Sequence, residues 1–233
     1  MTDRQHPQIT SRKKPRQARS SDLVAAILEA AIQVLSREGA TRFTTTRVAE
    51  RAGVSVGSIY QYFPNKAAIL FRLQSDEWRE TTDMLRATLA DASRPPLERL
   101  RRLVHAFLRS ECDEAAMRIA LADAAPLYRD APEARSVRAA SKGILQAFMR
   151  ETLPDARPAT RTLAGQLIKS TLSTVGQEFS EAPRSAREIA TYADAMADMF
   201  SAYLLGLGHV APAAAAAPAP TRGRTRSARA AAA

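Results

Sequence analysis

Apolar residues recur three or four positions apart along most of the chain, which is the spacing of one face of an α-helix. The first such segment can be capped by Ser20 or Ser21 and is expected to end at Gly39. No alternation typical of a strand competes with this spacing, and no repeat period is present. The pattern therefore predicts an all-α fold. The apolar stripe of the first helix consists of Val24, Ile27, Leu28, Ala31, Val34 and Leu35.

Two short helices follow the first, and each begins at a residue that can cap it. Thr44 precedes one, Ser55 precedes the other, and Gly53 separates them. Asn65 can cap a long fourth helix, which should end before the Pro95-Pro96 pair. Prolines punctuate the rest of the chain. Further helices are expected at residues 97–111, 113–124, 132–153, 158–179 and 185–207.

Basic residues are concentrated at the two ends of the chain. Residues 1–20 hold six basic residues against Asp3, a net charge of +5, and residues 211–233 hold four arginines, a net charge of +4. The whole chain carries +10, so residues 21–210 contribute about +1. Basic arms on a nearly neutral body suit a polyanion such as nucleic acid or an anionic membrane, although solubilising tails without a partner are the alternative. Residues 1–20 and 210–233 are expected to be disordered.

The remaining composition restricts the compartment and the chemistry. The single cysteine, Cys112, excludes an internal disulfide and fits a reducing cytoplasm, and its acidic neighbours Glu111 and Asp113 favour an inert thiol. Residues 199–221 lack charge, but their prolines and weakly apolar alanines argue against a membrane span. One cysteine and three histidines show no metal-ligand spacing. We therefore expect a cytoplasmic protein with no metal and no cofactor.

Residues 44–63 combine a helix, a glycine turn and a second helix of about two turns, which is a helix-turn-helix. Gly53 supplies the positive φ of the turn, and small apolar residues on both helices hold them at a fixed angle. The second helix starts with the compact residues Val56, Gly57 and Ser58, so its backbone can approach base edges in a major groove. The outward residues that can reach phosphates are Thr44, Tyr60, Tyr62 and Lys66.

This stretch resembles the DNA-binding domain of the tetracycline-repressor (TetR) family of transcriptional regulators. The resemblance covers about residues 21–70, and the remaining chain is similar only in being helical and of suitable length. The residues that carry it are Gly39, Thr44, Val48-Ala49, Ala52-Gly53-Val54-Ser55, Gly57-Ser58-Ile59-Tyr60, Tyr62-Phe63 and Lys66.

The resemblance implies a homodimer in which residues 21–68 bind double-stranded operator DNA. Residues 69–209 would then form a helical domain for dimerisation and for binding a small-molecule effector, whose pocket residues the sequence does not identify. Residues implied to face the major groove are Ser55, Val56, Gly57, Ser58 and Gln61. Residues implied to contact phosphates are Thr44, Tyr60, Tyr62 and Lys66, and Thr46 and Arg47 are further candidates for DNA contact.

Two other functions are weighed against a ligand-responsive repressor. The first is a helical enzyme or carrier with an incidental helix-turn-helix, although no nucleophile–base pair, phosphate loop or metal cluster is visible in the sequence. The second is a nucleoid-type protein that binds DNA without base preference through its basic ends. The sequence does not decide between repressor and activator. It also leaves the effector, the operator and the regulated genes open.

Overall fold

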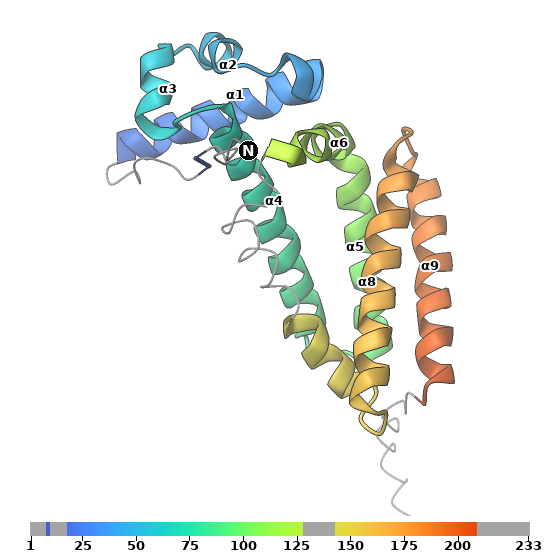
Figure 1. Ribbon diagram of the computed structural model, residues 1–233. Coiled ribbons are helices and arrows are strands. Elements are labelled where there is room, and N and C mark those ends of the chain that lie inside the picture. Colours follow the sequence, from blue (N-terminus) through green and yellow to red (C-terminus); the bar gives the residue numbers. More distant parts are fainter. Residues whose placement is uncertain (1–7, 10–17, 128–142, 209–233) are drawn as a thin grey trace, which may run out of the picture.

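The structure is a computed structural model that describes residues 8–9, 18–127 and 143–208 of the 233-residue chain. Its elements are α1 (Ala18–Arg42), α2 (Thr45–Ala52), α3 (Val56–Tyr62), α4 (Lys66–Leu89), α5 (Pro96–Asp113), α6 (Ala115–Ala124), the 3-10 turn η1 (Ala125–Leu127), the helical residues 143–152, α8 (Pro158–Ser180) and α9 (Ala186–Gly206). Helices α1 to α3 gather at one end, and α4 runs away from them toward the far end of the molecule (Figure 1). Across the described ranges every regular element is helical, which confirms the all-α prediction.

Helix α1 differs from its predicted bounds at both ends. It begins at Ala18, before the serines expected to cap it. Gly39 adopts φ 73° and ψ 173°, which breaks the helical path as expected, but helical turns resume and continue to Arg42. The fully buried ring of Phe43 follows directly and anchors this extension to the core. Gly39 is therefore a kink rather than the end of the element.

The predicted caps of the next three helices are confirmed. The Thr44 side chain accepts from the Arg47 amide of α2 at 3.3 Å, and the Ser55 side chain accepts from the Ser58 amide of α3 at 3.0 Å. Asn65 Oδ1 accepts from the Ala68 amide of α4 at 2.9 Å. Each cap satisfies a backbone donor that the helix itself leaves unpaired, so the positions at which these helices start are specified locally.

Part of the N-terminal arm has a defined place on the helices, contrary to the expectation of disorder. The side chain of Ile9 is 4 % exposed and belongs to the same apolar core as α1 to α3. Asn65 Nδ2 donates to the Gln8 carbonyl at 3.0 Å. An isolated apolar residue has no periodic signal in the sequence, which explains the missed contact. Residues 1–7 and 10–17 lie outside the described part of the chain.

Helices α8 and α9 run antiparallel and are joined by residues 181–185 (Figure 1). Ser185 and Glu188 form a capping box at the start of α9, and the Phe179 and Tyr192 rings stack across the pair with centroids 4.2 Å apart. Both helices pack on α5. Of the helix predicted over residues 132–153, only 143–152 falls in the described region and is helical there, and the predicted tail 210–233 lies outside it.

Helix α4 belongs to both halves of the molecule. Ile69, Leu70 and Leu73 lie in the core around α1, whereas Leu89 lies in the second core with α5, α8 and α9. Helix α6 also packs on α1, where Leu121 is 1 % exposed. The predicted division between residues 68 and 69 therefore falls inside a continuous helix. Motion at the far end of α4 is mechanically connected to α1 to α3.

Candidate nucleic-acid interface and internal cavity

Helices α2 and α3 are held at a fixed angle by a glycine turn and a small apolar contact. Gly53 has φ 67°, in the left-handed region, and its amide donates back to α2. The Val54 amide donates to the Ala49 carbonyl at 3.0 Å, which closes the turn. Val48 and Ile59 are fully buried between the helices. This geometry matches the helix-turn-helix expected from the sequence.

Most of the predicted DNA-contacting residues lie on the outer surface of α2 and α3. The Tyr60 side chain is 41 % exposed, and its hydroxyl lies 3.3 Å from Thr45 Oγ1, which holds the ring against α2. Ser55 Oγ lies 2.9 Å from Ser58 Oγ, so a hydroxyl pair marks the first turn of α3. Ser58 is half-buried. The exposed members of the predicted set are Thr44, Thr46, Arg47, Ser55, Gly57, Tyr60, Gln61 and Lys66.

Gly57 is a glycine that the fold does not require. Its backbone lacks a positive φ, and a Cβ added there would meet only Ser55 Oγ, at the ordinary distance of 3.6 Å. Glycine inside a helix costs about 1 kcal/mol relative to alanine. The fold itself therefore gives no reason for a glycine at this exposed position. Close approach of another molecule to the first turn of α3 would supply that reason.

Two predicted contact residues point inward instead. Tyr62 is 6 % exposed and is part of the apolar core, so the expectation that it reaches outward is wrong. Its position three residues after the buried Ile59 places both on the same face of α3. Val56 is half-buried and packs against the same core, so only part of it faces outward. Tyr60 and Tyr62 do point in different directions, as expected from their spacing, but only Tyr60 is outward.

The basic side chains of this surface differ in whether they are paired with other residues of the protein. Lys66 is exposed in the first turn of α4, and its ammonium forms no ion pair with another described residue. A lysine at a helix N-terminus is electrostatically unfavourable unless an anion lies nearby. Arg47 forms an ion pair with Glu38 of α1, and Arg51 donates to Gln33 at 2.5 Å. Lys66 is thus available to an external anion. Arg47 would have to leave Glu38 before it could bind one.

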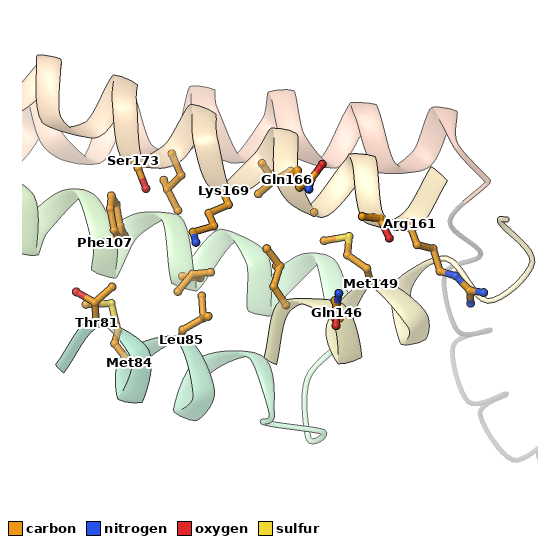
Figure 2. Close-up of a pocket in the computed structure, with 16 residues that line it drawn as sticks. Thr81, Met84, Leu85, Phe107, Gln146, Met149, Arg161, Gln166, Lys169 and Ser173 are labelled. Atoms are coloured by element: carbon orange, nitrogen blue, oxygen red, sulfur yellow. The ribbon is translucent and has the colours of Figure 1, made fainter. Parts of the chain in front are cut away.

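A cavity of about 370 Å³ lies between α4, α5, the helical residues 143–152 and α8. Figure 2 shows Lys169 reaching into it from α8, opposite Leu85 of α4. Sequence reasoning did not identify this residue, although it is the only charged residue between Arg161 and Glu178. Met84, Phe107 and Met149 also line the cavity. Its lining is Thr81, Met84, Leu85, Leu103, Phe107, Leu145, Gln146, Met149, Arg161, Thr162, Gly165, Gln166, Ile168, Lys169, Leu172 and Ser173.

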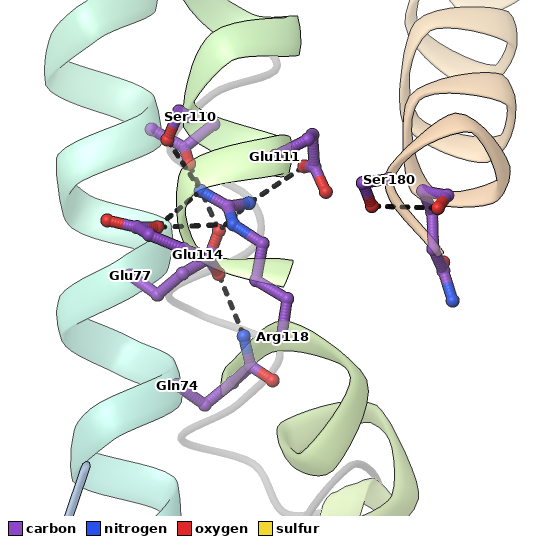
Figure 3. A network of polar contacts seen from close by, with 9 residues as sticks. Gln74, Glu77, Ser110, Glu111, Glu114, Arg118 and Ser180 are labelled. Carbon is purple, nitrogen blue, oxygen red and sulfur yellow. Dashed lines mark hydrogen bonds and ion pairs between the residues drawn. The ribbon is translucent and has the colours of Figure 1, made fainter. Parts of the chain in front are cut away.

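A polar network centred on Arg118 of α6 lies beside the cavity (Figure 3). Arg118 Nη1 donates to Glu77 Oε1 of α4 at 2.6 Å and to Glu111 Oε1 of α5 at 2.8 Å, and Nη2 donates to Glu114 at 3.0 Å. Burial raises the pKa of Glu77 and of Glu111, and the Arg118 charge partly offsets this. Thr81, which lines the cavity, donates to Glu77 at 3.1 Å. The network therefore connects the cavity wall with three helices.

Helices α8 and α9 carry exposed large apolar side chains in the described part of the chain. Leu163 and Leu167 on α8 are 60 % and 49 % exposed, and Met199 and Leu205 on α9 are 50 % and 51 % exposed. Because the helices are antiparallel, these residues lie at comparable distances from the connection at 181–185. Other apolar residues of the two helices, such as Leu172 and Phe200, are buried inside the subunit, so the four exposed side chains have no place in its core.

The described residues also bear on three other possibilities: a metal site, a reactive thiol and a membrane-spanning helix. These residues contain no group of three or more histidine, cysteine or acidic side chains that could hold a metal ion. Burial and the neighbouring Asp113 raise the pKa of the Cys112 thiol, which disfavours the reactive thiolate. No helix among them has both the length and the apolar character needed to cross a bilayer.

Two family models match the chain. The model of bacterial regulatory proteins of the tetR family matches residues 27–73, which contain α2, α3 and most of α1. The model of the tetracyclin repressor-like C-terminal domain matches residues 95–207, which run from α5 through α9. The first match lies within the core around α1, and the second covers most of the core of α5, α8 and α9 and also includes α6, which packs on α1.

Curated relatives match over part of their length. The nucleoid occlusion factor SlmA of Vibrio campbellii is 39 % identical over 84 residues, 35 % of this chain and 42 % of that protein. The HTH-type transcriptional regulator TtgR of Pseudomonas putida is 40 % identical over 81 residues, 34 % of this chain and 38 % of that protein. The chain thus spans less than half the length of these relatives.

Solved structures share the whole architecture at low sequence identity. The fatty acid degradation regulator FadR from Bacillus halodurans superposes with a TM-score of 0.63 and 21 % identity, over 84 % of this chain and 100 % of that one. At this identity the likeness establishes the fold.

Proposed function

Because the chain belongs to the tetR family of bacterial regulatory proteins, we propose that it is a homodimeric transcriptional repressor that a small-molecule effector releases from operator DNA. The observation that carries the proposal is the exposed first turn of α3, with its paired hydroxyls and a glycine that the fold does not need. It would act on the chromosome, in the cytoplasm. No catalytic step is assigned to it.

The proposed DNA interface divides into base-reading and phosphate-binding residues. Helix α3 would enter the major groove, where hydroxyl and amide side chains can read base edges at the close approach that Gly57 permits. Tyr60 and Lys66 would contact phosphates, which fix position without reading sequence. Tyr62 is left out because its side chain is buried. The proposed base-reading residues are Ser55, Val56, Gly57, Ser58 and Gln61, and the proposed phosphate contacts are Thr44, Tyr60 and Lys66, with Thr46 and Arg47 at the edge.

The proposed dimer uses the exposed apolar face of α8 and α9. Four large apolar side chains more than a third exposed on two adjacent helices form a patch of the kind that marks an interface. A second copy of the chain is its proposed occupant, because two helices from each subunit can pair as a four-helix bundle. A symmetric dimer would also present two copies of α3, which suits two half-sites on a duplex.

The effector would occupy the cavity beside α4. An apolar cavity of about 370 Å³ lies within the range of small-molecule sites, which begins at about 300 Å³. Its wall includes Thr81, Met84 and Leu85, all on the helix that continues into the DNA-binding end. A ligand that favours one position of α4 would therefore shift the spacing of the two α3 helices. Such a ligand changes DNA affinity only as far as it binds the two positions unequally.

Selection of binding sites from a random duplex library with the full-length protein tests the proposal. We expect enrichment of one sequence with two related half-sites, retained when a large excess of random duplex competes. Uniform binding without enrichment would instead support the nucleoid-type alternative, to which the partial match to SlmA is relevant. Absence of any duplex binding by a folded dimer would refute the proposal and leave the helical carrier.

A further inference from the structure

The cavity has the form of a slot that follows α8. Its lining on this helix extends from Arg161 to Ser173, and twelve residues at a rise of 1.5 Å correspond to about 18 Å. A space of this length suits an extended chain better than a compact ring system. The apolar side chains along it are Met84, Leu85, Leu103, Phe107, Leu145, Met149, Ile168 and Leu172.

The charges on the slot are all positive. Among the described residues no carboxylate lines it, and its two charged side chains are Lys169 and Arg161. Neither side chain forms an ion pair or a hydrogen bond with another described side chain. Glu77 and Glu111, in the network beside the slot, are already bound by Arg118. Within the described part of the chain, the slot thus offers an ammonium without an ion-pair partner beside an apolar channel.

We propose that the slot binds an amphiphile with an unbranched apolar chain and an anionic head, and that Lys169 holds the head. This inference rests on the proposed function only in treating the ligand as the effector. Figure 2 shows Lys169 extending from α8 toward the α4 and α5 side of the slot, at the end that also holds Ser173 and Thr81. The Ser173 hydroxyl is a further donor at this end, whereas the Thr81 hydroxyl already donates to Glu77 at 3.1 Å. The chain would run the other way, toward Leu145 and Met149.

Charge complementarity favours an anionic amphiphile over a cationic amphiphile or a neutral chain. A cationic amphiphile would be repelled by the like charge of Lys169. A neutral chain would fill the apolar part of the slot. It would displace water from the Lys169 ammonium without giving that ammonium an anionic partner. An anionic head supplies that partner through a charge-assisted hydrogen bond. Because Thr81 also donates to Glu77, a head group at this end would lie next to the contact that joins α4 to α6.

Calorimetric titration of the full-length protein with three probes of equal chain length tests the inference. The probes are decanoate and decyltrimethylammonium, each below its micellar concentration, and decanol below its solubility limit. We expect decanoate to bind about tenfold or more tightly than decanol, as a charge-assisted hydrogen bond provides, and decyltrimethylammonium to bind most weakly. Lys169→Met should abolish the difference between decanoate and decanol, whereas Lys169→Arg should retain it. Arg102→Gln, which removes an exposed cation of α5 outside the slot, is the matched control and should change nothing.

Equal binding of decanoate and decanol, tighter binding of the cationic probe, or an unchanged preference in Lys169→Met would each overturn the inference. Circular dichroism of Lys169→Met establishes that the variant is folded, which is expected for an exposed position. The titration needs no DNA, so its outcome is separate from that of the site selection. Operator binding without a preference for the anion would reject this inference alone, and anion binding without operator binding would reject the proposed function alone.

Discussion

Arg118 of α6 and Glu77 of α4, 41 positions apart in the sequence, are joined by a hydrogen bond of 2.6 Å between Nη1 and Oε1. Their side chains are only 14 % and 8 % exposed, so the pair is largely removed from water. Helix α6 packs on α1, and Thr81 links Glu77 to the cavity wall. The pair thus lies where the cavity, α4 and the DNA-binding end meet.

Replacing Arg118 with methionine should destabilise the protein by about 2–4 kcal/mol, because the loss of one partner leaves buried charge uncompensated. Glu77 and Glu111 would remain buried without a cation. Chemical denaturation at neutral pH measures the effect. Arg79→Met is the matched control: its ion pair with Asp76 is more exposed, and its loss should cost under about 1 kcal/mol. Equal effects in the two variants would show that the buried network adds nothing specific.

The same network predicts how stability depends on pH. Burial raises the pKa of Glu77 and of Glu111 above the ordinary value of 4.5, so the folded state holds these protons more tightly than the unfolded state. Their contribution to stability is fully present below pH 4.5 and is lost as pH rises through the folded pKa values. The free energy of unfolding of Glu77→Gln, measured between pH 4.5 and neutrality, should therefore fall less steeply than that of the parent. An identical slope would contradict the assignment.

Gly57→Ala should separate stability from DNA binding. The added Cβ meets only Ser55 Oγ at 3.6 Å, so the free protein should gain about 0.5–1 kcal/mol from the better helix former. Operator affinity should fall by about tenfold or more, because the methyl group occupies space next to the bases. Thermal unfolding and a gel-shift titration on the selected site measure the two effects. Retained affinity would mean that Gly57 does not approach DNA.

Substitutions on the proposed interface should separate base reading from phosphate binding. Lys66→Ala and Tyr60→Phe should weaken binding about equally on operator and random duplex, and Lys66→Ala should also reduce the salt dependence by about one unit. Ser58→Ala should instead alter the preference at one base pair. Site selection repeated with each variant reads out the difference. Loss of sequence preference in Lys66→Ala, with affinity held, would reverse the assigned roles.

Leu167→Glu should yield a folded monomer. The Leu167 side chain is 49 % exposed in one subunit, so the substitution costs that subunit little, whereas in the proposed dimer it would bury a charge. Sedimentation at micromolar concentration should show the change in mass, and DNA affinity should fall because the second half-site is lost. Arg187→Glu, at an exposed position of α9 outside the apolar face, serves as the control and should remain a dimer. A dimeric Leu167→Glu would place the interface elsewhere.

The sequence predicted the helix-turn-helix well because its determinants are local. Thr44, Ser55 and Asn65 cap their own helices, and Gly53 takes the positive φ of the turn that follows α2. Each acts within about one turn of its own position, so residue type and spacing suffice. The apolar period likewise indicated helices at nearly the observed bounds for α5, α8 and α9.

Features that depend on which face a distant element covers required the tertiary structure. Tyr62 turns inward because the core of α1 to α4 lies on its side of α3, and Ile9 is buried because that core has a site for it. The contact of Arg118 with Glu77 and the approach of Lys169 to α4 join residues far apart in the chain. A periodic pattern identifies an apolar face, but not whether that face meets its own core or remains free for a partner. By itself, therefore, the sequence determined the local geometry of the DNA-binding motif. The long-range packing of α4, α5, α6 and α8 decided where a ligand can bind and how its presence can reach that motif.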